Sequence, residues 1–149
     1  SPSSSEVAAG FDEVVECPMH MALAAVNIRP PTGVPPEGGL TMFQDCSLLE
    51  GRIIGDAMTA LTEWTDFVAE HQIGGPTWAA FPMAGERDDA DYDFKVVTGF
   101  ESPEAYGAAV EFYIAGGGVQ RAGQIMSRVM ECDSPRVYTM TPVRVPTGE

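Results

Sequence analysis

The chain has 149 residues, 44% of them hydrophobic and 20% charged, a composition typical of one globular domain. Its formal net charge of −14, with only 8 lysine and arginine residues, argues against a nucleic-acid partner, because binding to phosphates depends on clustered cations. No run of residues approaches the roughly 18 consecutive apolar residues that a membrane helix needs, so we expect no membrane partner.

The first 39 residues predict an N-terminal extension. It opens with a Ser/Pro-containing arm that shows no signal peptide, although a processed chain would look the same, so the compartment stays open. An apolar segment, Met19–Ile28, has an ambiguous period and predicts either an added strand or a short helix. Four prolines and three glycines in Arg29–Gly39 predict a stiff connection. The compact domain is therefore expected at residues 40–149.

The period of apolar residues in this domain predicts four strands and three helical segments. The predicted strands are Leu40–Leu48, Thr77–Met83, Tyr92–Phe100 and Arg136–Val145. The predicted helices are Ile53–Gln72, Pro103–Ala115 and Val119–Met130. The polar loop Ala84–Ala90 is short, so the second and third strands are expected to form a hairpin.

The stretch Asp91–Tyr113 is the clearest strand-to-helix passage in the chain. Alternate residues from Tyr92 to Phe100 form an apolar strand face that needs a cover. Ser102 followed by Pro103 predicts a helix N-terminus, since serine is a preferred N-cap and proline suits the first turn. The apolar residues Tyr106, Ala109, Val110 and Tyr113 are expected to form a stripe that folds back on this strand.

The order strand, helix, strand, strand, broken helix, strand predicts an α+β ferredoxin-like βαββαβ fold, an antiparallel sheet with helices on one face. The passages DYDFKVVTGFESPEAYGAAVEFY and QDCSLLEGRIIGDAMTALTEW resemble the dimeric α+β barrel superfamily, which includes antibiotic-biosynthesis-type monooxygenases and many uncharacterised small bacterial proteins. The resemblance covers residues 40–145. It implies a homodimer in which the bare sheet face is buried by a second copy.

The three cysteines are Cys17, Cys46 and Cys132, and they contain no CxxC pair. In a ferredoxin-like sheet the first and last strands are antiparallel neighbours, which brings Cys46 close to Cys132 and makes a disulfide possible. The alternatives are two buried free thiols, or a bridge or reaction that involves Cys17 instead.

Four residues are candidates for a catalytic role, namely His20, Asp93, Lys95 and Tyr113. Lys95 is the only lysine, and burial could shift its pKa; the alternative is an ion pair with Asp93 or with a dimer partner. His20 could serve as a general base.

A metal site is not predicted. His20 and His71 lack ligand spacing, and the acidic residues Asp88, Asp89, Asp91 and Asp93 lack the glycine and glutamate of a calcium loop. We interpret these acidic residues as a solvated hairpin loop.

Aromatic residues are the candidates for ligand binding: Trp64, Trp78 and Tyr106, with His71 beside them. They are expected to converge between sheet and helices, as core or as the lining of a pocket for a flat apolar molecule. Two functions therefore remain open. One is a dimer that binds a small apolar or aromatic molecule without a cofactor; the other is a cofactor-independent monooxygenase- or cyclase-like enzyme acting on an aromatic or polyketide-like substrate.

Overall fold

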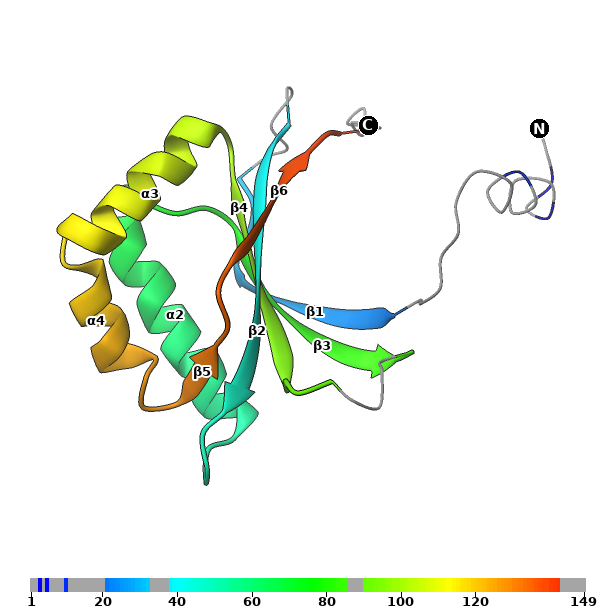
Figure 1. Ribbon diagram of the computed structural model, residues 1–149, viewed down its shortest axis with the longest axis horizontal. Helices are drawn as coiled ribbons and strands as arrows, with labels where there is room; N and C mark the ends of the chain where they lie inside the picture. Colours follow the sequence, from blue (N-terminus) through cyan, green and yellow to red (C-terminus); the bar gives the residue numbers. More distant parts are fainter. Residues whose placement is uncertain are drawn as a thin grey trace.

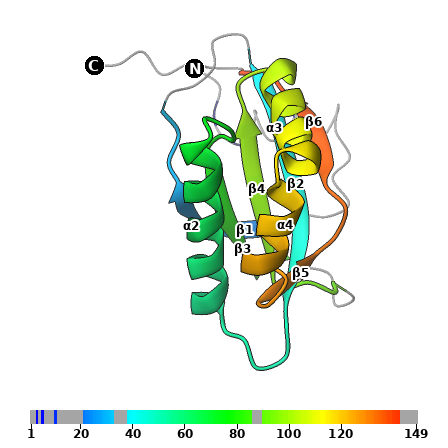
Figure 2. The same cartoon turned by 90° about the vertical axis from the view of Figure 1, so that its left-hand side faces the viewer.

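The computed structural model describes residues 21–32, 38–85 and 90–142, together with Ser3, Ser5 and Gly10. Within this part of the chain the protein is an α+β domain with a six-stranded antiparallel sheet and three helices. The elements, in chain order, are β1 (Ala22–Arg29), β2 (Gly39–Leu48), α2 (Ile54–Glu70), β3 (Thr77–Ala84), β4 (Phe94–Phe100), α3 (Pro103–Ala115), α4 (Gly118–Ile125), β5 (Met130–Cys132) and β6 (Arg136–Met140). All three helices lie on one face of a strongly curved sheet (Figures 1 and 2).

The strand order of the sheet is β1-β3-β4-β2-β5, and β6 also pairs with β2. Strand β2 therefore has β4 on one side, and on the other side β5 at one end and β6 at the other end. The expected hairpin neighbours β3 and β4 are antiparallel and paired, which confirms that part of the prediction. The single chain leaves this sheet open, with β1 and the β5–β6 side as its two edges.

The ambiguous segment Met19–Ile28 contributes a strand rather than a helix, in the part of it that the structure describes. Strand β1 pairs with β3, and Val26 lies opposite Ala79. A segment that precedes the Pro/Gly-rich connection thus belongs to the same sheet as the strands that follow it.

The core lies between the sheet and helices α2 and α4. Its buried residues pack as one cluster: Cys46, Ala57, Ala60, Leu61, Ala79, Phe94, Val96, Ile125 and Met130. Strand residues of this cluster alternate along β4, as expected for a strand with one face turned to the helices. The side chains of Phe94 and Leu61 are among the largest that are fully buried.

Helix α2 is the longest helix and is close to its predicted range. At its start, the carboxylate of Asp56 accepts a hydrogen bond from the backbone N–H of Ile53 at 3.1 Å, which satisfies one of the unpaired donors of a helix terminus. After its end, Gln72 has φ 59° and Gly74 has φ 81°, so the chain leaves the helix through left-handed backbone conformations.

Helix α3 begins as its sequence predicts, because the Ser102 hydroxyl accepts a hydrogen bond from the N–H of Ala105 at 3.2 Å and Pro103 opens the helix. The expected stripe folds back on the strand only in part: Tyr106 packs on Phe100 of β4 with ring centres 5.3 Å apart, whereas Val110 and Tyr113 are exposed and no residue of α3 is fully buried. Helices α2 and α4 supply the helical residues of the core cluster, and α3 contacts β2 and β4.

The glycines Gly116–Gly118 separate α3 from α4, and Gly117 has φ 88°, a conformation that glycine adopts without strain. Helix α4 ends at Ile125 and not at Met130 as predicted. A turn in which the N–H groups of Val129 and Met130 bond to the carbonyl of Met126 leads into β5. The predicted last strand, Arg136–Val145, is β6 over Arg136–Met140, and residues 143–145 lie outside the described part. No helix in the described part is long and apolar enough to cross a membrane.

Candidate functional site

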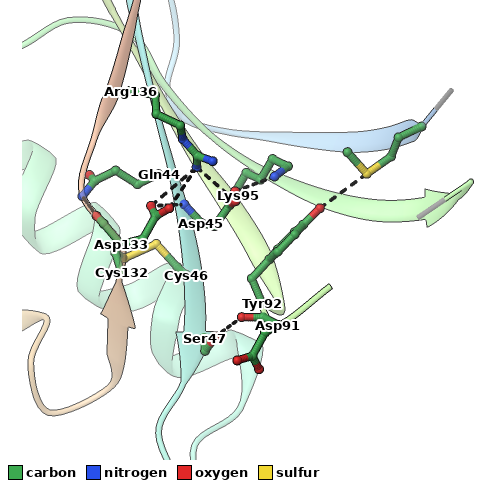
Figure 3. A network of polar contacts seen from close by, with 11 residues as sticks. Gln44, Asp45, Cys46, Ser47, Asp91, Tyr92, Lys95, Cys132, Asp133 and Arg136 are labelled. Carbon is green, nitrogen blue, oxygen red and sulfur yellow. Dashed lines mark hydrogen bonds and ion pairs between the residues drawn. A yellow bond between two sulfur atoms is a disulfide. The ribbon is translucent and has the colours of Figure 1, made fainter. Parts of the chain in front are cut away.

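A cluster of charged side chains lies on the sheet face opposite the helices (Figure 3). Cys46 of β2 is turned toward the helices and fully buried, so its neighbour Asp45 points to the other face. Asp45 lies opposite Lys95 of β4 in the sheet register, and the two side chains form an ion pair with Nζ and Oδ1 2.5 Å apart. The other carboxylate oxygen of Asp45 lies 3.0 Å from the Arg136 guanidinium of β6. Three strands therefore meet at one carboxylate.

Asp133 extends this cluster from the turn between β5 and β6. Its carboxylate accepts a hydrogen bond from the backbone N–H of Asp45 at 2.8 Å and lies 3.3 Å from Arg136. Its backbone carbonyl accepts a hydrogen bond from the Gln44 side chain at 3.1 Å. These contacts hold the turn against β2.

Lys95 has an aromatic neighbour as well as its ion-pair partner. Its ammonium lies 3.9 Å from the centre of the Tyr92 ring, a cation–π contact. The Tyr92 hydroxyl donates to the sulfur of Met21, just before β1, at 3.4 Å. Figure 3 shows this chain of contacts crossing the sheet from Arg136 to Tyr92.

The pKa shifts in this cluster favour the charged forms of both partners. Burial is the largest single influence on Lys95 and by itself would lower its pKa, but the hydrogen bonds and charges of Asp45 and Tyr92 together raise the pKa above its ordinary value. Burial would likewise raise the pKa of Asp45, and the hydrogen bonds and charges of Lys95 and Arg136 together lower it. Lys95 thus remains a cation at neutral pH.

The structure pairs Lys95 with Asp45 on the neighbouring strand and not with Asp93. The carboxylate of Asp93 instead accepts a hydrogen bond from the backbone N–H of Leu48 at 2.7 Å, and Asp93 is exposed. It therefore caps the end of β2 and lies beside the loop that precedes β4. The observed contact of Asp93 is thus with the backbone of β2.

The structure brings Cys46 and Cys132 together as a disulfide. They are directly opposite in the register of β2 and β5, with Cα atoms 4.0 Å apart. The backbone N–H of Asp133 donates to the carbonyl of Asp45, so the ladder hydrogen bond lies beside the two cysteines and not between them. Cys46 and Cys132 are therefore a non-hydrogen-bonded pair, the kind in which facing residues approach most closely. The bridge fastens the short strand β5 to the centre of the sheet.

The aromatic candidates do not converge on one site. Trp64 of α2 and Tyr113 of α3 meet edge to face, with ring centres 6.2 Å apart, while Tyr106 packs on Phe100. Trp78 lies on the opposite sheet face, because its neighbour Ala79 is buried beneath the helices. The four aromatic side chains therefore serve two separate surfaces.

His71 lies at the C-terminal end of α2 within a group of rings. Its ring centre is 4.7 Å from that of Phe67 and 4.9 Å from that of Phe112, and its Nδ1 lies 2.8 Å from the Phe67 carbonyl oxygen. His71 thus helps to pack α2 against α3.

Two shallow hollows lie on the helix layer. One, of about 460 Å³, is lined by α2 residues including Thr62 and Glu63; the other, of about 430 Å³, is lined by Ile73 and by α3 residues including Phe112. Neither brings together the charged candidates of the sheet face. No group of three or more potential metal ligands occurs among the residues that the structure describes. His20, Cys17, Asp88 and Asp89 lie outside those residues.

Comparisons with known proteins assign no family. No protein-family model matches the chain, and no curated protein matches it significantly. Among solved structures, the solution structure of a hypothetical protein of Arabidopsis thaliana is similar, with a TM-score of 0.49 and 16% sequence identity. The match covers 76% of this chain and 96% of that chain. A likeness this distant carries no functional argument, so function has to be argued from the geometry.

Sequence reasoning missed Asp45 as the partner of Lys95, and it missed Asp133 and Arg136 as members of the same cluster. Each lies in a different segment, and only the strand register brings them together. One signal in the sequence could have found Asp45. It lies one residue before Cys46, on a predicted strand whose two neighbouring strands were also predicted.

Proposed function

We propose that the protein is a homodimeric ferredoxin-like binding protein, whose sheet face opposite the helices packs on a second copy and takes up a small apolar or aromatic molecule. The observation that carries this proposal is the composition of that face. It bears six large apolar side chains that are at least partly exposed: Leu23, Phe43, Trp78, Val97, Tyr138 and Met140. An antiparallel sheet whose second face meets water normally alternates to polar residues there.

The strand order supports the ferredoxin-like plan. The C-terminal strands lie beside β2, and β4 lies between β2 and β3. Two interlocked βαβ units produce this arrangement, to which β1 is added at the edge. The sheet is open in one chain, so a barrel would require the sheet of a second copy.

The charges on this face are compatible with contact to a second copy. The whole chain carries a net charge of −14, so two copies repel each other over most of their surfaces. The cluster on the sheet face contains Lys95 and Arg136 against Asp45 and Asp133, and its formal charge is therefore zero. Charges that are already paired are less costly to bury in an interface than unpaired ones.

The sheet face is also the better place for the ligand in this structure. The space between helices and sheet holds the core cluster that includes Leu61 and Phe94. On the other face Pro76 and Trp78 lie against Gly99, and Phe43 and Tyr138 meet edge to face at 5.7 Å. Aromatic surfaces beside a few fixed polar groups are typical of small-molecule sites.

Among the residues that the structure describes, the geometry favours binding over catalysis. A cofactor-independent monooxygenase- or cyclase-like enzyme needs a base near its substrate. Lys95 is held protonated by Asp45, because its pKa is raised, and Tyr113 and His71 lie in the helix layer on the other side of the sheet. Lys95 and Arg136 are better suited to orient an acidic group on a ligand.

Light scattering of the full chain tests the dimer. We expect twice the 15.9 kDa of one chain for the wild type, and a shift toward the monomer for Tyr138→Glu, which places a charge on the sheet face. Ile114→Glu is the matched control, since Ile114 is 71% exposed on α3. A monomeric wild type, or equal dissociation of both variants, would contradict the proposed interface.

Energy transfer from tryptophan to bound anilinonaphthalenesulfonate, an aromatic anion, tests the ligand site. The chain offers a matched pair, because Trp78 lies on the sheet face and Trp64 in the helix layer. The signal is titrated with the dye to obtain its affinity. We expect Trp64→Phe to keep the wild-type affinity and Trp78→Phe to bind the dye more weakly. The opposite pattern would move the site to the helix layer and reject the sheet face.

A further inference from the structure

Strand β1 forms an open edge of the sheet. On one side it pairs with β3 through most of its length, and among the described residues no strand lies on its other side. Figure 1 shows β1 beside β3 at the rim of the sheet, and α2 contacts β1 on the helix side. The unpaired N–H and C=O groups of an edge strand are a template for another strand.

The two edges of this sheet differ in their protection. On the far side, β5 and β6 are interrupted by Asp133–Pro135, and β6 starts with the charged Arg136; proline, charge and short strands all discourage pairing. Strand β1 has none of these features from Ala22 to Ile28. Its residues Ala22–Asn27 are exposed, and its register irregularities lie only near the two ends.

We propose that the open edge of β1 pairs in antiparallel fashion with β1 of a second copy, so that two sheets continue into one. This contact goes beyond the proposed dimer, which uses the sheet face and not its edge, and it joins such dimers into larger assemblies at higher protein concentration. A two-fold axis at Ala25 places Val26 of one copy opposite Ala24 of the other, and Leu23 opposite Asn27. An interface of this kind is self-complementary, as two-fold symmetry requires.

The charge pattern of β1 allows it to pair with a copy of itself. Two chains of net charge −14 approach most easily along a segment that carries no charge, and β1 is uncharged up to Arg29. With the axis at Ala25, Arg29 of one copy faces Met21 of the other, so no like charges are opposed. Like charges directly opposite each other would weaken a strand pair.

A charge-swap pair at Val26 tests the proposal. Val26 is 45% exposed, so Val26→Lys and Val26→Glu leave the core intact. In the proposed pair, the introduced charges of the two copies lie on the same sheet face at diagonal positions. We expect each variant alone to weaken edge pairing about tenfold. An equimolar mixture of the two should restore it, because opposite charges then meet. Ile114→Lys and Ile114→Glu are the controls, since Ile114 lies on α3 and 71% exposed.

The readouts are native mass spectrometry and amide hydrogen exchange of β1 at two protein concentrations. For mass spectrometry one variant is uniformly labelled with ¹⁵N, because the lysine and glutamate variants are almost equal in mass, so that mixed and unmixed pairs can be counted. We expect the wild-type β1 amides to be more protected at the higher concentration, and mixed pairs to outnumber unmixed ones in the charge-swap mixture. Exchange of β1 that does not change with concentration, or a mixture that restores nothing, would overturn the proposal. Tyr138→Glu separates the two contacts, because it disrupts the sheet face and should leave the concentration-dependent protection of β1.

Discussion

Removal of the disulfide is the sharpest test of how the C-terminal strands are held. The double variant Cys46→Ala/Cys132→Ala opens a loop whose ends are separated by 86 residues. In the chain-entropy treatment of cross-links, a loop of this length restricts the unfolded chain by about 4.6 kcal/mol at 25 °C. For a chain of this size each kcal/mol corresponds to roughly 2–4 °C in Tm. We therefore expect a loss of about 3–5 kcal/mol and of roughly 10–15 °C.

The assay is urea unfolding at pH 7, followed by tryptophan fluorescence, with Cys17→Ala as the control that keeps the bridge. The control should unfold at the wild-type midpoint. A loss below about 1 kcal/mol in the double variant would refute this account, since removing a native disulfide from a small domain typically costs 2–5 kcal/mol. So would three titratable thiols in the native, unreduced wild type.

Two further substitutions test local features. Asp45→Asn should cost about 2 kcal/mol at pH 7, as expected for hydrogen bonds to charged groups, measured by urea unfolding across pH. Since the folded pKa of Asp45 is lowered, its contribution is present above the unfolded value near 3.8 and is lost as the pH falls through the folded value; an equal cost at pH 7 and pH 2 would contradict this. The pKa of Lys95 is raised, so its contribution is present below 10.5 and is lost as the pH rises through the folded value. Ser102→Ala should cost about 1 kcal/mol in urea, because the N–H of Ala105 loses its acceptor; Ser102→Asn, which can still cap, should recover most of it.

The fold was predictable wherever local chemistry agrees with packing. The range Pro103–Ala115 was predicted to the residue, because Ser102 and the glycines after Ala115 define both ends of the helix. The period of β4 was equally clear, since Phe94, Val96 and Phe100 are all buried. These signals depend on neighbours in the sequence.

The burial of a helix face is not a local property. The predicted stripe on α3 reaches β4 only through Tyr106, which packs on Phe100, while Val110 and Tyr113 are exposed. The core around Phe94 is filled by Leu61 of α2 and Ile125 of α4. Which helix covers a given part of the sheet depends on loop lengths and side-chain volumes across the whole domain. The period of one helix does not contain that information.

The charged cluster was out of reach for the same reason. Lys95 stood out as the only lysine, but its partners are 50 residues earlier in the chain and, through Asp45, 41 residues later at Arg136. Their meeting depends on the register of three strands. A shift of one residue in any of these strands would turn the side chain to the other face.

The position of β2 has a consequence for how the chain folds. This strand lies near the beginning of the domain, yet its last neighbour, β6, comes from the end: Gly39 lies opposite Met140 and Leu40 opposite Thr139. Contacts between residues so distant in sequence slow folding, because the chain loses loop entropy before these contacts form. During synthesis from the N-terminus, β2 stays unpaired on this side until the chain has been made as far as β6. Until then the growing chain exposes an apolar strand edge, so we expect folding intermediates of this protein to be more prone to association than its native state.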